Sequence, residues 1–160
     1  MNTLNALVTY FSASGVTAAV AMRLSEGIAA ELYEIAPKTP YTDDDLNWMD
    51  KNSRSTLEMK DETCRPPLKD HDAPIKDHDI IFVGFPIWWY REPSIIDSFL
   101  DAYDFTGKTV IPFATSGGSG IGKAQNRIAE LTSATVLPGK LLAPKASERE
   151  LKDWVRSLPL

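Results

Sequence analysis

The sequence predicts a single α/β domain in which helices cover both faces of a parallel sheet. Short apolar runs rich in β-forming residues alternate with longer stretches of helical period, and this alternation is typical of consecutive βαβ units. Two of the runs are apolar almost throughout, as strands covered on both faces are. The length of 160 residues suits one domain, so we expect a doubly wound, three-layer sandwich over residues 1–160.

Five runs are expected to form the sheet: residues 6–11, 31–35, 80–85, 108–114 and 134–137. The first and third are the nearly continuous apolar runs and should be central. The second and fifth are shorter and more polar, which indicates outer strands. Pro112 lacks an amide donor, so a bulge or weakened pairing is expected in the fourth run.

Helices are expected where apolar residues recur at helical spacing, in residues 16–28, 95–103, 121–131 and 151–158. Each apolar stripe should pack against the sheet. The segment from Pro37 to Lys76 lacks such a period and carries several prolines and acidic residues, so we expect a short helix with long loops there. An irregular stretch of this length is usually functional or mobile, and it is a candidate cover for one side of a ligand.

Charge and cysteine content exclude several classes of function. A formal net charge of −5, with no stripe of Lys and Arg, disfavours nucleic acid as a partner. An acidic surface suits either simple solubility or attraction to a basic redox partner. Cys64 is the only cysteine, which rules out an internal disulfide, a CxxC pair and a multi-cysteine metal site. No apolar run approaches the ~18 residues of a membrane span and residues 1–11 do not resemble a signal peptide, so we expect a cytoplasmic protein that binds no membrane.

The loop after the first strand is a candidate phosphate site, which we call the phosphate loop. It consists of Ser12, Ala13, Ser14, Gly15, Val16 and Thr17, and it leads directly into the first helix. A helix N-terminus presents unpaired amides and the positive end of the helix dipole, so it can hold a phosphate without Lys or Arg. Three hydroxyls around one glycine exceed the needs of a simple helix cap. Such a cradle suits a terminal monophosphate, as in flavin mononucleotide (FMN), better than a triphosphate with Mg²⁺.

Two further strand ends carry loops that suit a flat ring. The first ring loop, after the third strand, is Pro86, Ile87, Trp88, Trp89 and Tyr90, and three consecutive surface aromatics are costly unless something flat covers them. The second ring loop, after the fourth strand, is Thr115, Ser116, Gly117, Gly118, Ser119 and Gly120, where backbone amides can approach a ring. Core packing of one or two aromatics is the alternative. A Walker-type triphosphate site is disfavoured because Ala124 stands where Mg²⁺ would need Ser or Thr.

With the motifs YFS-x-SG-x-T, G-x-P-I-W-W and TSGGSG-x-G in this order, the sequence resembles the flavodoxins, and more closely the short bacterial flavodoxin-like proteins. The resemblance covers nearly the whole chain. It implies a flavodoxin-like fold with a five-stranded parallel sheet, strand order 2-1-3-4-5 and bound FMN. It also implies that the phosphate loop holds the FMN phosphate and that the two ring loops hold the isoalloxazine.

Two positions depart from the flavodoxin pattern. Electron-shuttling flavodoxins commonly have a glycine after the first ring-loop Trp, where a peptide flip favours the neutral semiquinone, but here Trp89 and Tyr90 follow Trp88. A positive φ is costly at such bulky residues, which weighs against that stabilisation. Arg91 is expected to place a cation near the ring, which would favour an anionic reduced flavin.

The leading hypothesis is an electron carrier, in which FMN supplies the redox chemistry and exchanges electrons with redox partner proteins or a flavin reductase. No catalytic acid or base is then required, and His71 and His78 are expected at the surface, outside any Ser/His/Asp constellation. The first alternative is an FMN-dependent NAD(P)H:quinone-type oxidoreductase. The second is a non-redox binding module that uses the three consecutive aromatic side chains for a protein partner.

Overall fold

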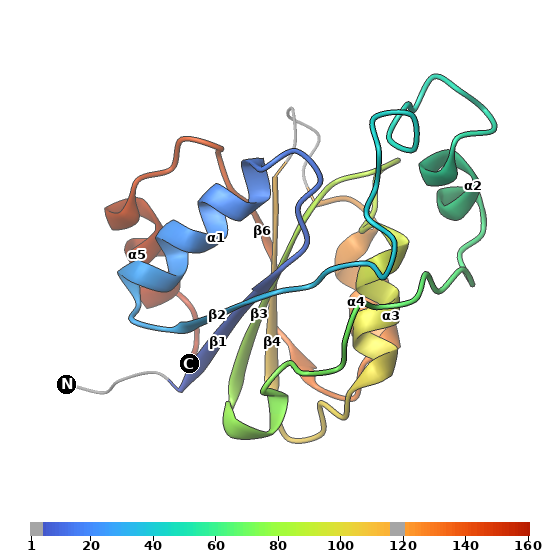
Figure 1. Cartoon of the computed structure of the whole chain (residues 1–160). Helices are drawn as coiled ribbons and strands as arrows, with labels where there is room; N and C mark the ends of the chain where they lie inside the picture. The colour runs from blue at the N-terminus through green and yellow to red at the C-terminus, as the bar shows by residue number, and fades with distance from the viewer. Residues whose placement is uncertain (1–4, 116–120) are drawn as a thin grey trace.

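The computed structural model describes residues 5–115 and 121–160, and it shows a parallel sheet between two layers of helices (Figure 1). The strands are β1 (Ala6–Tyr10), β2 (Glu31–Glu34), β3 (Ile80–Pro86), β4 (Thr109–Thr115), β5 (Thr135–Val136) and β6 (Lys140–Leu141). Their order is β2-β1-β3-β4-β5, and β6 also pairs with β4. Each pairing between these six strands is parallel. The predicted fold class and strand order are confirmed, and β6 is an addition to them.

The outer side of β4 is divided at Pro112. β5 pairs with β4 at Thr109 and Val110, whereas β6 pairs with it at Phe113 and Ala114. Toward β3 the register continues through Pro112. Because proline has no amide hydrogen, β4 offers no donor at this point, and the weakened pairing predicted there is found on the outer side.

Helices cover both faces of the sheet. They are α1 (Val16–Gly27), α2 (Arg54–Lys60), α3 (Ser94–Ala102), α4 (Ala124–Leu131) and α5 (Glu148–Arg156), with a 3₁₀ turn at Ile75–Asp77. α1 and α5 pack on one face, where Leu24 and Trp154 belong to one buried cluster. α3 and α4 pack on the other face through a second cluster that includes Phe99 and Ile128. Figure 1 shows these two pairs on opposite sides of the sheet.

The segment from Pro37 to Lys76 consists of α2, a series of turns and an antiparallel bridge between Pro37 and Leu68. It lies beside α3, toward the carboxyl ends of the strands (Figure 1). The prediction that His78 lies at the surface is wrong. The residue is 8% exposed, and its Nδ1 lies 2.8 Å from Pro74 O. Among the helices described, none combines the length and the apolar character that crossing a bilayer requires.

Candidate functional site

A cavity opens where the phosphate loop and the first ring loop meet. β1, β3 and β4 are neighbours in a parallel sheet, so the loops that follow them lie at one edge of that sheet. The cavity has a volume of about 530 Å³, within the range of small-molecule sites. Its walls consist of Ala13, Ser14, Leu46, Trp48, Ser55, Pro86, Ile87, Trp88, Trp89 and Tyr90.

The phosphate loop leaves several backbone amides free of helical partners. Gly15 precedes α1 with a φ of 91°, and no side chain caps the helix. The first helical bond runs from the amide of Ala19 to Gly15 O, at 3.1 Å. The amides of residues 16–18 therefore point out of the helix end, as an anion site requires. Ser12 stabilises the loop itself, because its Oγ accepts a hydrogen bond from the Gly15 amide at 3.1 Å.

Thr17 connects the phosphate loop to the end of β4. Its side chain is buried, and its Oγ1 lies 2.8 Å from Oγ1 of Thr115, so that one hydroxyl donates to the other. Ser14, in contrast, is exposed and lines the cavity. Thr115 is buried and is the first residue of the second ring loop. The other predicted residues of that loop, Ser116, Gly117, Gly118, Ser119 and Gly120, lie outside the described residues.

The first ring loop contains a tight two-residue turn. The amide of Trp88 donates to Arg91 O at 3.0 Å, and the amide of Arg91 donates to Trp88 O at 3.1 Å. Trp89 and Tyr90 lie between them with φ values of 46° and 67°. Positive φ at both central residues is the pattern of a type I′ turn, which usually contains Asn-Gly. The expectation that these bulky residues would avoid a positive φ is therefore wrong.

A neighbouring loop holds this turn in place. The amide of Lys123 donates to Tyr90 O at 2.9 Å. Gly122 has a φ of +61°, and a Cβ added there would lie 2.3 Å from Tyr90 O. A left-handed conformation costs an L-residue roughly 1–2 kcal/mol. These contacts show how the surrounding structure supports a turn that the local sequence does not favour.

Trp88 differs from its two neighbours in its surroundings. It packs edge to face against Phe11 and Tyr41, with ring centroids 5.6 and 5.4 Å away. Trp89 and Tyr90 are exposed and stand at the cavity. Trp88 is thus partly a packing residue, in agreement with the alternative that one or two of these aromatics belong to the core, and its neighbours present the free aromatic surface.

The segment from Pro37 to Lys76 contributes one wall of the cavity, as expected of a candidate cover. The residues involved are Leu46, Trp48 and Ser55. Sequence reasoning did not single them out, because the segment has no period that separates inward from outward positions. A lone Trp within a polar stretch was the one available signal.

Comparison with known proteins agrees with this arrangement. The sequence model of the family described as Flavodoxin matches residues 5–158, nearly the whole chain. The chain belongs to the flavodoxin family. No curated protein matches it.

Solved structures also resemble this flavodoxin-family chain. A protein from Bacteroides eggerthii, assigned to the flavoproteins, is 40% identical with a TM-score of 0.92, and the match covers 97% of this chain and 98% of the other. One from Bacteroides uniformis, with the same assignment, is 42% identical with a TM-score of 0.91 over 98% and 100% of the chains. A flavoprotein from Lactobacillus acidophilus, solved in complex with FMN, is 21% identical with a TM-score of 0.69 over 94% and 97%, and this likeness concerns the fold.

Arg91 does not face the cavity of this flavodoxin-family chain, so the expected cation near the ring is wrong. Its side chain is buried, and Nη2 donates to Met59 O in α2 at 3.1 Å. Nη1 lies 3.5 Å from Asp97 Oδ2 and 3.8 Å from Glu92 Oε2. The guanidinium is thus neutralised behind the first ring loop and connects that loop to α2.

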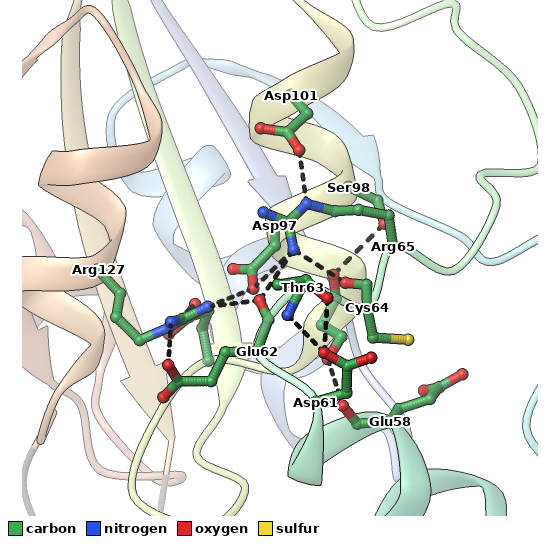
Figure 2. Close-up of polar contacts among 12 residues, drawn as sticks. Glu58, Asp61, Glu62, Thr63, Cys64, Arg65, Asp97, Ser98, Asp101 and Arg127 are labelled. Carbon is green, nitrogen blue, oxygen red and sulfur yellow. Dashed lines mark hydrogen bonds and ion pairs between the residues drawn. The ribbon is translucent and has the colours of Figure 1, made fainter.

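Arg91 is part of a buried ionic cluster that also contains Glu92, Asp97 and Arg127. Arg127 Nε lies 3.0 Å from Glu92 Oε2, and its Nη2 lies 2.7 Å from Asp97 Oδ2. Figure 2 shows Arg127 and Arg65 approaching Asp97 from two sides. Burial, followed by the neighbouring Asp97 carboxyl, raises the pKa of Glu92 to about 8.

Proposed function

We propose that this protein binds FMN, with its phosphate on the phosphate loop and its isoalloxazine in the cavity, and that it carries electrons between redox partners. One observation carries the proposal: Ala13 and Ser14 belong both to the phosphate loop and to the cavity wall. A ligand with an anionic end and a flat ring can therefore contact the free amides and the aromatic surface together. FMN has both features.

The residues at the site fit FMN in charge and in shape. The phosphate loop contains hydroxyls and amides and no Lys or Arg, which suits a monophosphate. The exposed rings of Trp89 and Tyr90 suit stacking on a flat heterocycle. In the proposed complex, Ser12 to Thr17 bind the phosphate, Pro86 to Tyr90 contact one side of the ring, and Thr115 to Gly120 contact its edge.

The cavity walls favour the carrier over a reductase that uses NAD(P)H. FMN supplies the redox chemistry when it is bound, and the chain orients the ring and excludes water from it. Apart from Tyr90, the described residues that line the cavity have no ionisable side chain. Apart from Tyr90 these residues supply no general acid or base, and an electron carrier requires none.

Titration with FMN and with riboflavin tests the placement of the phosphate. Riboflavin has the same ring and no phosphate, so the protein should bind FMN more tightly. Ser14→Ala should weaken FMN binding roughly tenfold, because a hydrogen bond to a charged group contributes about 1.5–3 kcal/mol. The same variant should leave riboflavin binding unchanged. Equal affinities for the two flavins in the wild type would place the phosphate elsewhere.

Photoreduction of the FMN-loaded protein tests the electron carrier. A carrier should pass through a flavin semiquinone and should oxidise no NAD(P)H unless a reductase is added. Steady oxidation of NAD(P)H by the protein alone, with a quinone as acceptor, would instead establish the oxidoreductase. A colourless protein that fails to bind added FMN would favour the non-redox binding module.

A further inference from the structure

Trp48 stands at the cavity with most of its side chain in solvent. It is 71% exposed, although Trp has one of the largest apolar surfaces of any side chain. It lines the same cavity as Trp89 and Tyr90 but belongs to a different segment, between Tyr41 and α2. Exposed aromatic surface at the wall of a ligand site usually marks a contact that the ligand completes.

The backbone around Trp48 is held in a defined position. Thr42 and Asp45 exchange hydrogen bonds, since the Thr42 amide donates to Asp45 Oδ2 at 3.0 Å and the Asp45 amide donates to Thr42 Oγ1 at 3.1 Å. The Leu46 amide donates to Thr42 O at 3.1 Å, and the Ser55 amide donates to Asp45 O at 3.0 Å. The turn before Trp48 is therefore fixed to the start of α2.

α2 is in turn fixed to the body of the protein. Arg54 Nε lies 3.0 Å from Glu58 Oε2, and the Arg54 guanidinium stacks 3.9 Å from the centroid of the Tyr41 ring. Tyr41 packs against Trp88 in the first ring loop. Arg91, the residue that follows this loop, donates to Met59 O. The segment that carries Trp48 is thus anchored to the first ring loop, which lines the same cavity.

The second ring loop has no aromatic residue of its own. Residues 116–120 read Ser-Gly-Gly-Ser-Gly, so its side chains offer nothing that could stack on a ring. A flat ligand held against Trp89 and Tyr90 would have its other face open to water unless another segment covers it. In the described part of the chain, Trp48 is the aromatic side chain outside the first ring loop that lines the cavity.

We infer that Trp48 stacks on the isoalloxazine face turned away from the first ring loop, so that the segment from Pro37 to Lys76 forms part of the flavin site. This inference rests on the proposed function. It assigns to a residue outside the three motif loops the role of covering the ring and excluding water. The affinity of this protein for FMN and for riboflavin then depends partly on Trp48, which does not contact the phosphate.

Three variants test the inference: Trp48→Ala, Trp48→Phe and the matched control Met49→Ala. Met49 is the adjacent residue and is 74% exposed, but it does not line the cavity. Because Trp48 is largely in solvent, Trp48→Ala should fold with unchanged thermal stability in the absence of flavin. It should bind FMN and riboflavin equally more weakly, each by about tenfold, because aromatic stacking on a flat base is worth about 1–3 kcal/mol.

The same variants should also change the absorption spectrum of bound FMN. Loss of the cover hydrates the ring, so Trp48→Ala should blur the vibronic structure of the flavin band, while Trp48→Phe and Met49→Ala should retain both the structure and most of the affinity. Wild-type affinity and spectrum in Trp48→Ala would overturn the inference, as would an equal loss in Met49→Ala. Failure of the wild type to bind FMN would overturn the proposed function instead, so the two failures are distinct.

Discussion

The left-handed turn at Trp89 and Tyr90 predicts an unusual order of stability for substitutions at position 90. Tyr90→Ala and Tyr90→Gly both remove a phenol ring that is 68% exposed, so they share the small loss of packing. They differ in the backbone. Ala retains the cost of the φ of 67° and Gly does not, so the glycine variant should be the more stable of the two.

The size of the difference follows from two opposing effects. Replacing Ala by Gly removes the cost of a left-handed conformation, which is roughly 1–2 kcal/mol for an L-residue. The greater conformational entropy of Gly in the unfolded chain opposes this and destabilises the glycine variant by about 0.5–1 kcal/mol. The net gain in the free energy of unfolding is about 0.5–1 kcal/mol, which corresponds to a rise in Tm of about 1–4 °C for a chain of this size.

Ala29→Gly calibrates this value within the same protein. Ala29 follows the end of α1 with a φ of 53°, and the Ala30 amide donates to Ser25 O at 2.8 Å, as in a Schellman motif that usually contains Gly. Ala29 is exposed and is no part of the cavity, so its replacement should stabilise the protein by a similar amount without changing FMN affinity.

Thermal and urea unfolding of the flavin-free variants measure the effect, and FMN titration measures its functional consequence. Tyr90→Gly should unfold at a higher temperature than Tyr90→Ala, and both should bind FMN more weakly than wild type because both lack the phenol ring. The reasoning is refuted if Tyr90→Ala is the more stable of the pair while Ala29→Gly shows the expected gain.

Two further predictions concern the supports of the first ring loop. Gly122→Ala should weaken FMN binding and destabilise the fold, because its Cβ would lie 2.3 Å from Tyr90 O. Gly107 has a φ of +80° and open space around it, so the control Gly107→Ala should destabilise the fold without weakening FMN binding. Equal FMN affinities of these two variants would show that the Gly122 contact is unimportant. The raised pKa of Glu92 means that the folded protein binds more protons than the unfolded chain between about pH 4.5 and 8, so stability should fall as the pH rises through this range. Glu92→Gln should flatten that decline in urea titrations at several pH values, and an unchanged slope would show that Glu92 is not its source.

The strands and the loop that leads into α1 were predictable because their causes are local. An apolar run followed by hydroxyls, a glycine and a helical stripe specifies a strand, a turn and a helix within about thirty residues, which is the scale of one βαβ unit. The weakened pairing at Pro112 was equally local, because it follows from one missing amide hydrogen.

The features that were missed or predicted wrongly depend largely on distant segments. Arg91 is buried because Met59 O and the Asp97 carboxylate, which Arg127 also contacts, supply its surroundings. Met59 and Arg127 are each more than thirty residues from Arg91 in the sequence. The turn that follows Trp88 was unexpected because local propensity favours Asn-Gly there, and a hydrogen bond from Lys123 overrides that preference. The segment from Pro37 to Lys76 forms part of the cavity wall through packing that cannot be predicted from a periodic pattern, because the segment has none.

The break in the outer pairing of β4 also affects how this protein meets its own copies. A long edge strand has a row of unpaired amides and carbonyls that can pair with a strand of another chain, and such pairing commonly starts aggregation. Here one margin consists of the two-residue strands β5 and β6, which meet β4 on either side of Pro112. The opposite margin, β2, is four residues long and has exposed Glu31 and Glu34 at its ends. Neither margin offers a long, uncharged ladder, so both disfavour edge-to-edge association in a crowded cell.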